Sequence, residues 1–262
     1  MRKFGFKTYS TNLHTASNLI KECADYVTTV SDAFIELMIE PSSTMADLKK
    51  IKAQTGDVEV RVHAPHDGMG FDPGNKELAA KNQALVASAQ KAADLFGSQT
   101  IVVHAGLGHG QKYIDETVRQ FKLFNDSRIV VENLPYLDYG TVPMHGSTAE
   151  DISYIMHETG CGFCFDFSHA VCSAISLKAN IDEHLKKFYD LHPTVYHMCD
   201  GDTNKADDLH LHFRKGNFPL PHFLNDFTAK DAYITIETSM HVEPDVSFKI
   251  EDYIYLKSLQ KA

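Results

Sequence analysis

The chain has 262 residues, which is enough for one large domain or two small ones, and a single α/β barrel usually has about 250 residues. Its net charge of −10 and its five arginines give no basic footprint for nucleic acid at the level of the whole chain, although a local positive groove can exist on an acidic protein. No apolar run approaches the roughly 18 residues of a membrane span, and the N-terminus does not resemble a signal peptide. We therefore expect a cytoplasmic protein with no membrane partner.

The five cysteines are an odd number, and Cys161-Gly-Phe-Cys164 is formally a C-x-x-C pair. A redox pair of this type lies at the start of a helix after a strand, whereas this one lies at the start of an expected strand. We expect buried, reduced thiols, with redox or zinc binding as the alternatives.

Short apolar runs alternate with segments of helical spacing along the whole chain. The expected strands are Phe4–Phe6, Phe34–Ile39, Val58–Val62, Thr100–Val103, Arg128–Val131, Gly162–Phe165, Thr194–Tyr196 and Tyr233–Ile236. The expected helices include Leu13–Val27, Glu77–Phe96, Lys112–Phe124, Ile181–Leu191, Leu220–Phe227 and Val246–Leu259. Eight such units predict a parallel sheet covered by helices and closed into one (β/α)8 TIM barrel, with a single domain over residues 1–262.

Most of the apolar runs end in a histidine, an aspartate or a glutamate. The C-terminal ends of barrel strands converge on one face, which is where the active sites of such barrels lie. Nine candidate metal ligands occur at these ends or in the loops just after them: His63, His104, Glu132, Asp166, His169, His197, Asp208, His210 and Glu237. Any one of them alone is more often a hydrogen-bonded core or rim residue, but their joint placement predicts a metal site.

Nine nitrogen and oxygen ligands are more than one ion can use, and they suit Zn²⁺, or Mn²⁺ for subsets rich in carboxylates. A carboxylate such as Glu132 can bridge two ions. A cluster of this kind polarises a phosphoryl or carbonyl oxygen and lowers the pKa of a bound water.

The same motifs resemble those of the endonuclease IV group (apurinic/apyrimidinic endonuclease family 2), within the xylose-isomerase-like barrel superfamily. The matching motifs, in chain order, are H-A-P at His63, H-A-G at His104, E-N at Glu132, D-F-S-H at Asp166, Y-H-M-C-D at His197, D-L-H at Asp208 and I-E-T at Glu237. The resemblance spans roughly residues 63–237.

The resemblance implies a site with two or three zinc ions that hydrolyses a phosphodiester, in abasic-site DNA or in a smaller phosphoester. It assigns the first ion to His63, His104 and Glu132, the second to Glu132, Asp166, His197 and Glu237, and the third to His169, Asp208 and His210. Glu132 and Glu237 are the expected catalytic residues.

The chain also departs from the family pattern. The segment Glu40–Ala46 has no arginine, glutamine or large aromatic residue with which to bend DNA, and His66 stands where the family has tyrosine. The segment Lys7-Thr-Tyr-Ser lacks the family's His-Val-Ser signature.

Two alternatives remain open. A sugar isomerase or epimerase of the same superfamily would use one ion held by Glu132, Asp166, His197 and Glu237, with the two glutamates moving a proton beside a carbonyl group. Loop residues would then contact the sugar, and the candidates are His66, Tyr136, Tyr139, His145 and His212. The other alternative is a metal-binding barrel without catalytic activity.

Overall fold

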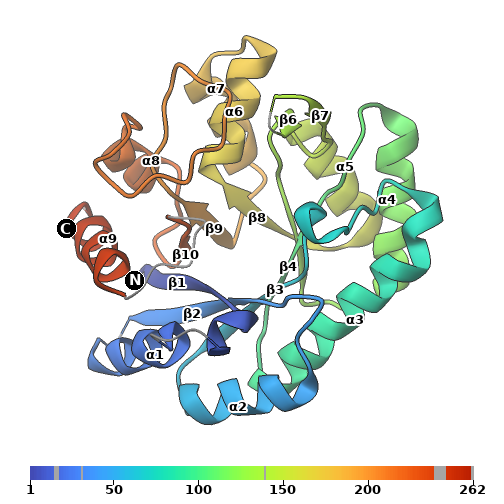
Figure 1. The fold of residues 1–262 in the computed structure, drawn as a ribbon. Coiled ribbons are helices and arrows are strands. Elements are labelled where there is room, and N and C mark those ends of the chain that lie inside the picture. The colour runs from blue at the N-terminus through green and yellow to red at the C-terminus, as the bar shows by residue number, and fades with distance from the viewer. Residues whose placement is uncertain (15–17, 31, 139, 239–245, 261–262) are drawn as a thin grey trace.

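Eight parallel strands close into a barrel in the computed structural model (Figure 1), which describes residues 1–262 except 15–17, 31, 139, 239–245 and 261–262. Around the barrel the strands follow the order β1-β10-β9-β8-β5-β4-β3-β2. Their bounds are β1 (Lys3–Tyr9), β2 (Ala33–Met38), β3 (Val60–His63), β4 (Ile101–His104), β5 (Ile129–Glu132), β8 (Gly162–Asp166), β9 (Val195–Met198) and β10 (Tyr233–Ile236). This architecture confirms the predicted (β/α)8 TIM barrel.

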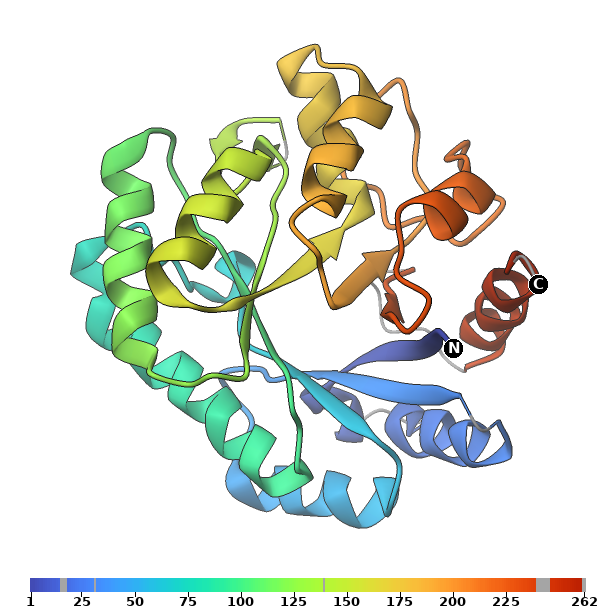
Figure 2. The same ribbon diagram turned by 180° about the vertical axis from the view of Figure 1, so that it is seen from behind.

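The helices lie outside the ring of strands and cover it on all sides (Figures 1 and 2). They are α1 (Leu19–Thr29), α2 (Met45–Thr55), α3 (Ala79–Phe96), α4 (Gln111–Phe124), α5 (Ala149–Thr159), α6 (Phe167–Leu177), α7 (Ile181–Tyr189), α8 (Leu220–Asp226) and α9 (Ser247–Ser258). Helix α9 packs against β1 and β10, which brings the two ends of the chain close together. None of the described helices is long and apolar enough to cross a membrane.

The start of the chain differs from the sequence prediction. Instead of one helix over Leu13–Val27, a 3-10 helix (Ser10–His14) precedes α1, and residues 15–17 between them lie outside the described residues. A small antiparallel hairpin, β6 (Leu137–Asp138) and β7 (Val142–Pro143), occupies the long loop after β5.

Helix α6 was also missed by the sequence analysis. It follows β8 without a loop, and the Asp166 side chain caps it by accepting a hydrogen bond from the His169 backbone N–H at 2.7 Å. The same carboxylate therefore ends a strand and starts a helix. This cap places His169 in the first turn of α6, directly above the end of the strand.

The alternation of side chains along each strand separates the barrel interior from the layer beneath the helices. Val102, Val130, Cys164 and Val195 form a small apolar cluster of their own, separate from the main core. Each lies two residues before a predicted ligand on the same strand, so it points into the barrel one layer below that ligand. The ligands thus stand on an apolar floor that excludes water from beneath them. All five cysteines are unpaired, and four of them are buried.

The opposite end of the barrel interior is filled by Phe34, Tyr233 and Arg61. The two rings pack 5.5 Å apart, and the Arg61 guanidinium lies 3.3 Å from the centre of the Tyr233 ring. This packing requires Gly5, because a Cβ atom at that position would lie 2.3 Å from the Phe34 ring.

We expect Gly5→Ala to destabilise the protein by about 1–3 kcal/mol, the usual cost of overpacking a filled core. Denaturant unfolding of the variant and the wild type would measure the difference. Gly5→Ala combined with Phe34→Leu should recover part of the loss, because the smaller side chain makes room for the methyl group. Equal stability of Gly5→Ala and the wild type would show that the barrel does not close as described.

Candidate metal centre

Glu132 lies at the centre of the predicted ligands and is fully buried at the end of β5. Its Oε2 atom is 3.1 Å from His63 Nε2 and 3.4 Å from His104 Nε2. Its other oxygen, Oε1, is 3.1 Å from Nδ1 of His197, which lies on β9, two strands away around the barrel. Two ligands of one tetrahedral zinc ion are separated by about 3.3 Å, given bond lengths of about 2.0–2.1 Å. Glu132 therefore faces two candidate ion positions, one through each oxygen.

The second of these positions is surrounded by residues from β8, β9 and β10. His197 Nδ1 is 3.0 Å from Glu237 Oε1 and 4.0 Å from Asp166 Oδ2. Strand register explains this meeting, since Asp166 and His197 are neighbours across the β8–β9 pair. Two of the remaining predicted ligands thus converge on the nitrogen that faces Glu132.

A third group lies beside the first two. Asp208 Oδ2 is 3.2 Å from His169 Nε2 and 2.5 Å from His210 Nε2. Ser168 holds the other oxygen of this carboxylate, because its hydroxyl donates to Asp208 Oδ1 at 2.6 Å. The structure therefore brings all nine predicted ligands together in three adjoining groups.

Each of the five histidines keeps one ring nitrogen toward the centre and points the other at an acceptor outside it. The outer nitrogens of His63, His169 and His210 lie 2.7–2.8 Å from the backbone carbonyls of Ala64, Asn133 and Glu237, respectively. A metal-binding histidine needs this arrangement, because the outer bond selects the tautomer that leaves the inner nitrogen free to bind. The donor set therefore fits metal ions.

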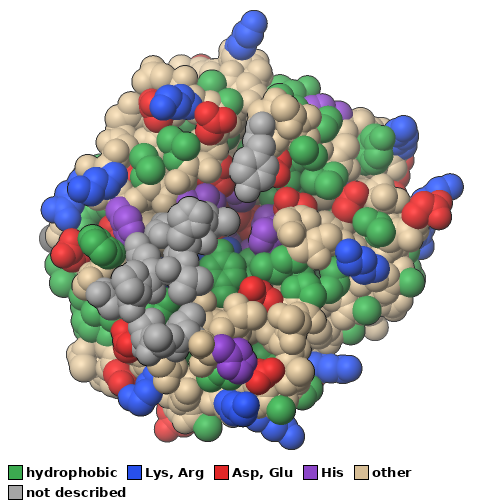
Figure 3. All heavy atoms as spheres, viewed as in Figure 1, with side chains coloured by type: hydrophobic (Ala, Val, Ile, Leu, Met, Phe, Trp, Pro, Cys, Tyr) green, Lys and Arg blue, Asp and Glu red, His purple; other side chains and the backbone are tan. Residues whose placement is uncertain are grey.

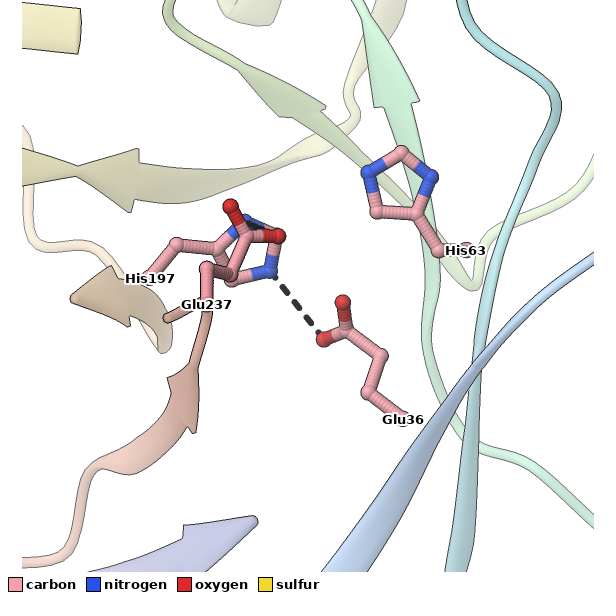
Figure 4. A group of neighbouring side chains, drawn as sticks. All are labelled: Glu36, His63, His197 and Glu237. Atoms are coloured by element: carbon pink, nitrogen blue, oxygen red, sulfur yellow. Dashed lines mark hydrogen bonds and ion pairs between the residues drawn. The ribbon is translucent and has the colours of Figure 1, made fainter. Parts of the chain in front are cut away.

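For the other two histidines the outer acceptor is a carboxylate. His104 Nδ1 is 3.0 Å from Asp67 Oδ1, and His197 Nε2 is 3.1 Å from Glu36 Oε2. Figure 4 shows the Glu36–His197 contact as a dashed line. Thr235 donates to the same Glu36 oxygen at 2.7 Å. Neither acidic residue is among the ligands predicted from the sequence, although a glutamate inside the apolar run of β2 is an informative signal.

The centre opens into a cavity of about 380 Å³. Its described walls include His104, Glu132, His169, Asp208 and Glu237. Figure 3 shows histidine and acidic side chains at the bottom of the hollow on this face, with hydrophobic side chains beside them. Most of the Lys and Arg side chains visible in that view lie toward the edge of the molecule.

The structure separates the five candidate sugar-binding residues. His66 lines the cavity, as expected for a substrate contact. His145 does not: it is buried, its Nε2 is 2.8 Å from the Thr117 hydroxyl, and its Nδ1 is 3.1 Å from two loop carbonyls, so it braces the loops after β4 and β5. The Tyr136 ring packs on His109 with ring centres 4.1 Å apart. Tyr139 lies outside the described residues.

His212 lies in a different hollow from the metal centre. That hollow is lined by His212, Phe213, Arg214, Lys215, Phe248, Glu251 and Asp252. The His212 Nδ1 atom is 2.6 Å from Asp252 Oδ2, so this ring is held at the outer end of the loop that carries His210. The geometry therefore supports His66 among the described candidates, and not His145 or His212.

Burial and opposite charges shift the pKa values of the centre in different directions. Burial opposes the charged form of His104, but Glu132 and Asp67 raise its pKa to about 9. Burial acts in the same way on His210, and Asp208 raises its pKa to about 9. His63 differs, because burial and then the nearby Lys7 charge lower its pKa to about 4. Burial raises the pKa of Asp166 to about 6.

We expect Glu36→Gln to weaken metal binding by about 10- to 100-fold, the scale reported when the acceptor behind a metal-binding histidine is lost. The amide is as large as the carboxylate but accepts a weaker hydrogen bond from His197, so that ring is less firmly oriented. Equilibrium dialysis of wild type and variant against zinc would measure the change. The exposed carboxylate Glu77 provides the control variant, Glu77→Gln, and an equal affinity of all three proteins would contradict the role of Glu36.

Zinc affinity should also rise with pH between about 6.5 and 9. The pKa values of His104 and His210 are raised in the fold, so protons bound to these rings stabilise the metal-free protein. This stabilisation is complete below about pH 6.5, the pKa of histidine in the unfolded chain, and is lost as the pH rises through about 9. Zinc must displace these protons, so its apparent affinity should increase by up to about tenfold per pH unit for each proton released. Zinc competition with a chelator at several pH values, beside unfolding of the metal-free protein, would test both trends. A flat affinity over this range would contradict the assignment of these two ligands.

Comparison with known proteins shows similarity along almost the whole chain. A search of curated protein sequences finds no match. Solved structures with the same fold include a D-tagatose 3-epimerase-like protein, with 18% identity, 98% of this chain and 96% of that chain covered, and a TM-score of 0.71. Endonuclease IV from Thermus thermophilus has 18% identity, 98% coverage of both chains and a TM-score of 0.69. Another Thermus thermophilus protein, soaked with ZnCl2, has 15% identity, coverage of 98% and 97%, and a TM-score of 0.67.

The family model of the xylose isomerase-like TIM barrel matches residues 24–253. This range contains all nine predicted ligands and every barrel strand except β1. The chain therefore belongs to the xylose isomerase-like TIM barrel family.

Proposed function

We propose that this protein is a metal-dependent hydrolase of phosphodiesters with a three-ion zinc site. The observation that carries the proposal is the position of Glu132, whose two oxygens face separate ligand groups, with a third group beside them. A site for a single ion does not need three groups of this kind. Phosphodiester hydrolysis does benefit from them, because negative charge builds on both the attacking and the leaving oxygen.

The proposal divides the ligands among three ions in the way that the sequence resemblance implies. The first ion would be held by His63, His104 and Glu132, the second by Glu132, Asp166, His197 and Glu237, and the third by His169, Asp208 and His210. When bound, such ions supply a water of lowered pKa and neutralise charge on the phosphoryl oxygens. Manganese would suit the second group, which is the richest in carboxylates.

The chain's own residues contribute orientation and exclusion of water. The apolar floor of Val102, Val130, Cys164 and Val195 closes the site from below. The carbonyl and carboxylate acceptors hold the five imidazole rings before any ion binds, so little reorganisation is needed. His66 lines the cavity beside this set and is placed to contact the substrate.

The cavity supports a smaller phosphoester more strongly than abasic-site DNA. Among its described wall residues, Lys7 is the single Lys or Arg, so the phosphate charge must be met chiefly by the ions. The segment after β2, Glu40-Pro-Ser-Ser-Thr-Met-Ala46, offers no arginine and no large aromatic side chain to insert into a duplex. The net charge of −10 also repels a polyanion.

A sugar isomerase or epimerase remains the second candidate. Its specific support is the cluster of Glu132, Asp166 and Glu237 around His197 Nδ1, which is a complete ligand set for one ion. The two glutamates would then exchange a proton with carbon atoms of a sugar. The structural similarity to an epimerase-like protein is compatible with this chemistry but, at 18% identity, concerns the fold alone.

The decisive experiment measures metal content and activity on the same preparation. Elemental analysis of protein purified without chelator should find about two to three ions per chain, because structural clusters of this kind retain their metals. The protein should cleave bis(p-nitrophenyl) phosphate, with loss of cleavage on chelation and in Glu132→Ala. The surface variant His157→Ala is the matched control and should retain full activity.

Two further substrates separate the candidates. Metal-dependent incision of duplex DNA that carries one abasic analogue would identify DNA as the substrate instead of a smaller phosphoester. One ion per chain, no phosphodiester cleavage, and exchange of solvent deuterium into a ketose would overturn the hydrolase proposal in favour of the isomerase.

A further inference from the structure

Lys7 is a positive charge inside the ligand cluster, and neither the family resemblance nor the proposed ion assignment uses it. It lies near the end of β1, its side chain is 11% exposed, and it borders the cavity. Its Nζ atom contacts Glu237 Oε1 directly and lies 3.8 Å from Glu36 Oε1. Strand register enforces the second approach, because Lys7 and Glu36 are neighbours across the β1–β2 pair.

Four residues around this ammonium are spaced so that they could bind one cation, and three of them are also ligands of the proposed first and second ions. Glu36, His63, His197 and Glu237 each offer one ligand atom, and these atoms all lie within 4.8 Å of one another. Figure 4 shows the four side chains pointing toward a common space, from β2, β3, β9 and the end of β10. Two carboxylates and two imidazoles suit a divalent ion.

Glu36 shows that a cation belongs there. Its carboxylate is fully buried, and its Oε1 atom has no hydrogen-bond partner among the described residues. The other oxygen is already used by His197 and Thr235. A buried anionic oxygen without a partner costs several kcal/mol unless a positive charge lies near, and Lys7 is the cation closest to it.

We propose that the Lys7 ammonium occupies a position between Glu36 and Glu237 that would otherwise accept a metal ion. Its positive charge thereby weakens the binding of the neighbouring metal ion at Glu237. The inference rests on the proposed function, because Glu237 is a ligand of the proposed second ion. The ammonium and the second ion compete for Glu237 Oε1, which contacts Lys7 and also lies 3.0 Å from His197 Nδ1. The ammonium and the second ion share this oxygen and repel each other.

The metal centre is therefore uneven. The ion held by Glu237 shares a ligand oxygen with Lys7 and is the weakest and the first to be lost, whereas the other two proposed ions do not use Glu237. This ion is also the one that a single-ion isomerase would require, so Lys7 works against that chemistry in this chain.

Substituting Lys7 tests the inference through metal binding alone. Lys7→Met keeps the length of the side chain and removes its charge. In equilibrium dialysis against buffered zinc, followed by elemental analysis, it should bind the weakest ion at least about tenfold more tightly than the wild type, or hold one more ion per chain. Lys7→Arg keeps a positive charge and should resemble the wild type.

Two controls make the comparison specific. Lys3→Met removes a charge from the same strand, but Lys3 pairs with Glu59 at the surface, so zinc binding should not change. Lys7→Met combined with Glu36→Gln should lose the gain, because the amide supplies no charge for the additional cation. Lys7→Gln replaces Lys7→Met if the latter does not fold, as judged by circular dichroism.

Equal or weaker zinc binding by the uncharged variants would overturn the inference. Equal binding would mean that Lys7 has no effect on the ions, and weaker binding would mean that Lys7 is needed to position Glu237. Failure of the proposed function is a separate result. Wild-type protein that cleaves no phosphodiester would refute the hydrolase, while the difference in zinc binding between Lys7→Met and wild type would still decide the role of Lys7.

Discussion

The buried carboxylate of Glu132 is the constraint on which the rest of the site depends. Burial alone would favour its neutral form, but His197 and His104 hold its pKa well below the usual value, so it is an anion in the apolar centre of the barrel. An uncompensated charge there would cost several kcal/mol. The fold meets this cost with imidazole rings from three other strands, on both sides of the carboxylate. The ring nitrogens that meet Glu132 are also the atoms that would bind metal ions.

The parallel barrel is what makes such a cluster possible. All eight strands run in the same direction, so a polar residue placed at the end of each strand reaches the same face without exposing the apolar layer beneath it. Neighbouring strands keep their ligands in register, as His104 and Glu132 show. The orientation of each ring then depends on a second set of groups, the carbonyls and carboxylates behind the histidines, which come from loops or from other strands.

The excess of negative charge in this cluster bears on the chemistry proposed for it. At least six carboxylates lie within it or against it: Glu36, Asp67, Glu132, Asp166, Asp208 and Glu237. Among the described lysines and arginines, Lys7 alone lines their cavity. A substrate that is itself anionic would be repelled by this set unless several divalent ions are present. In the proposed hydrolase, ion occupancy, which the Lys7 contact would modulate, would therefore govern substrate binding as well as catalysis.

The sequence by itself predicted the barrel and the nine candidate ligands that the structure brings together, because a buried parallel strand appears as an apolar run and most of these ligands end such a run. It did not reveal α6, since Asp166 ends a strand and caps a helix without an intervening loop. Only the tertiary structure decided the roles of Glu36 and Lys7. These charges lie within strands, and Glu36 meets His197, 161 positions away, only when the barrel closes. Local spacing carries no information about such a contact, and the same is true of His145 and His212, which fold away from the centre.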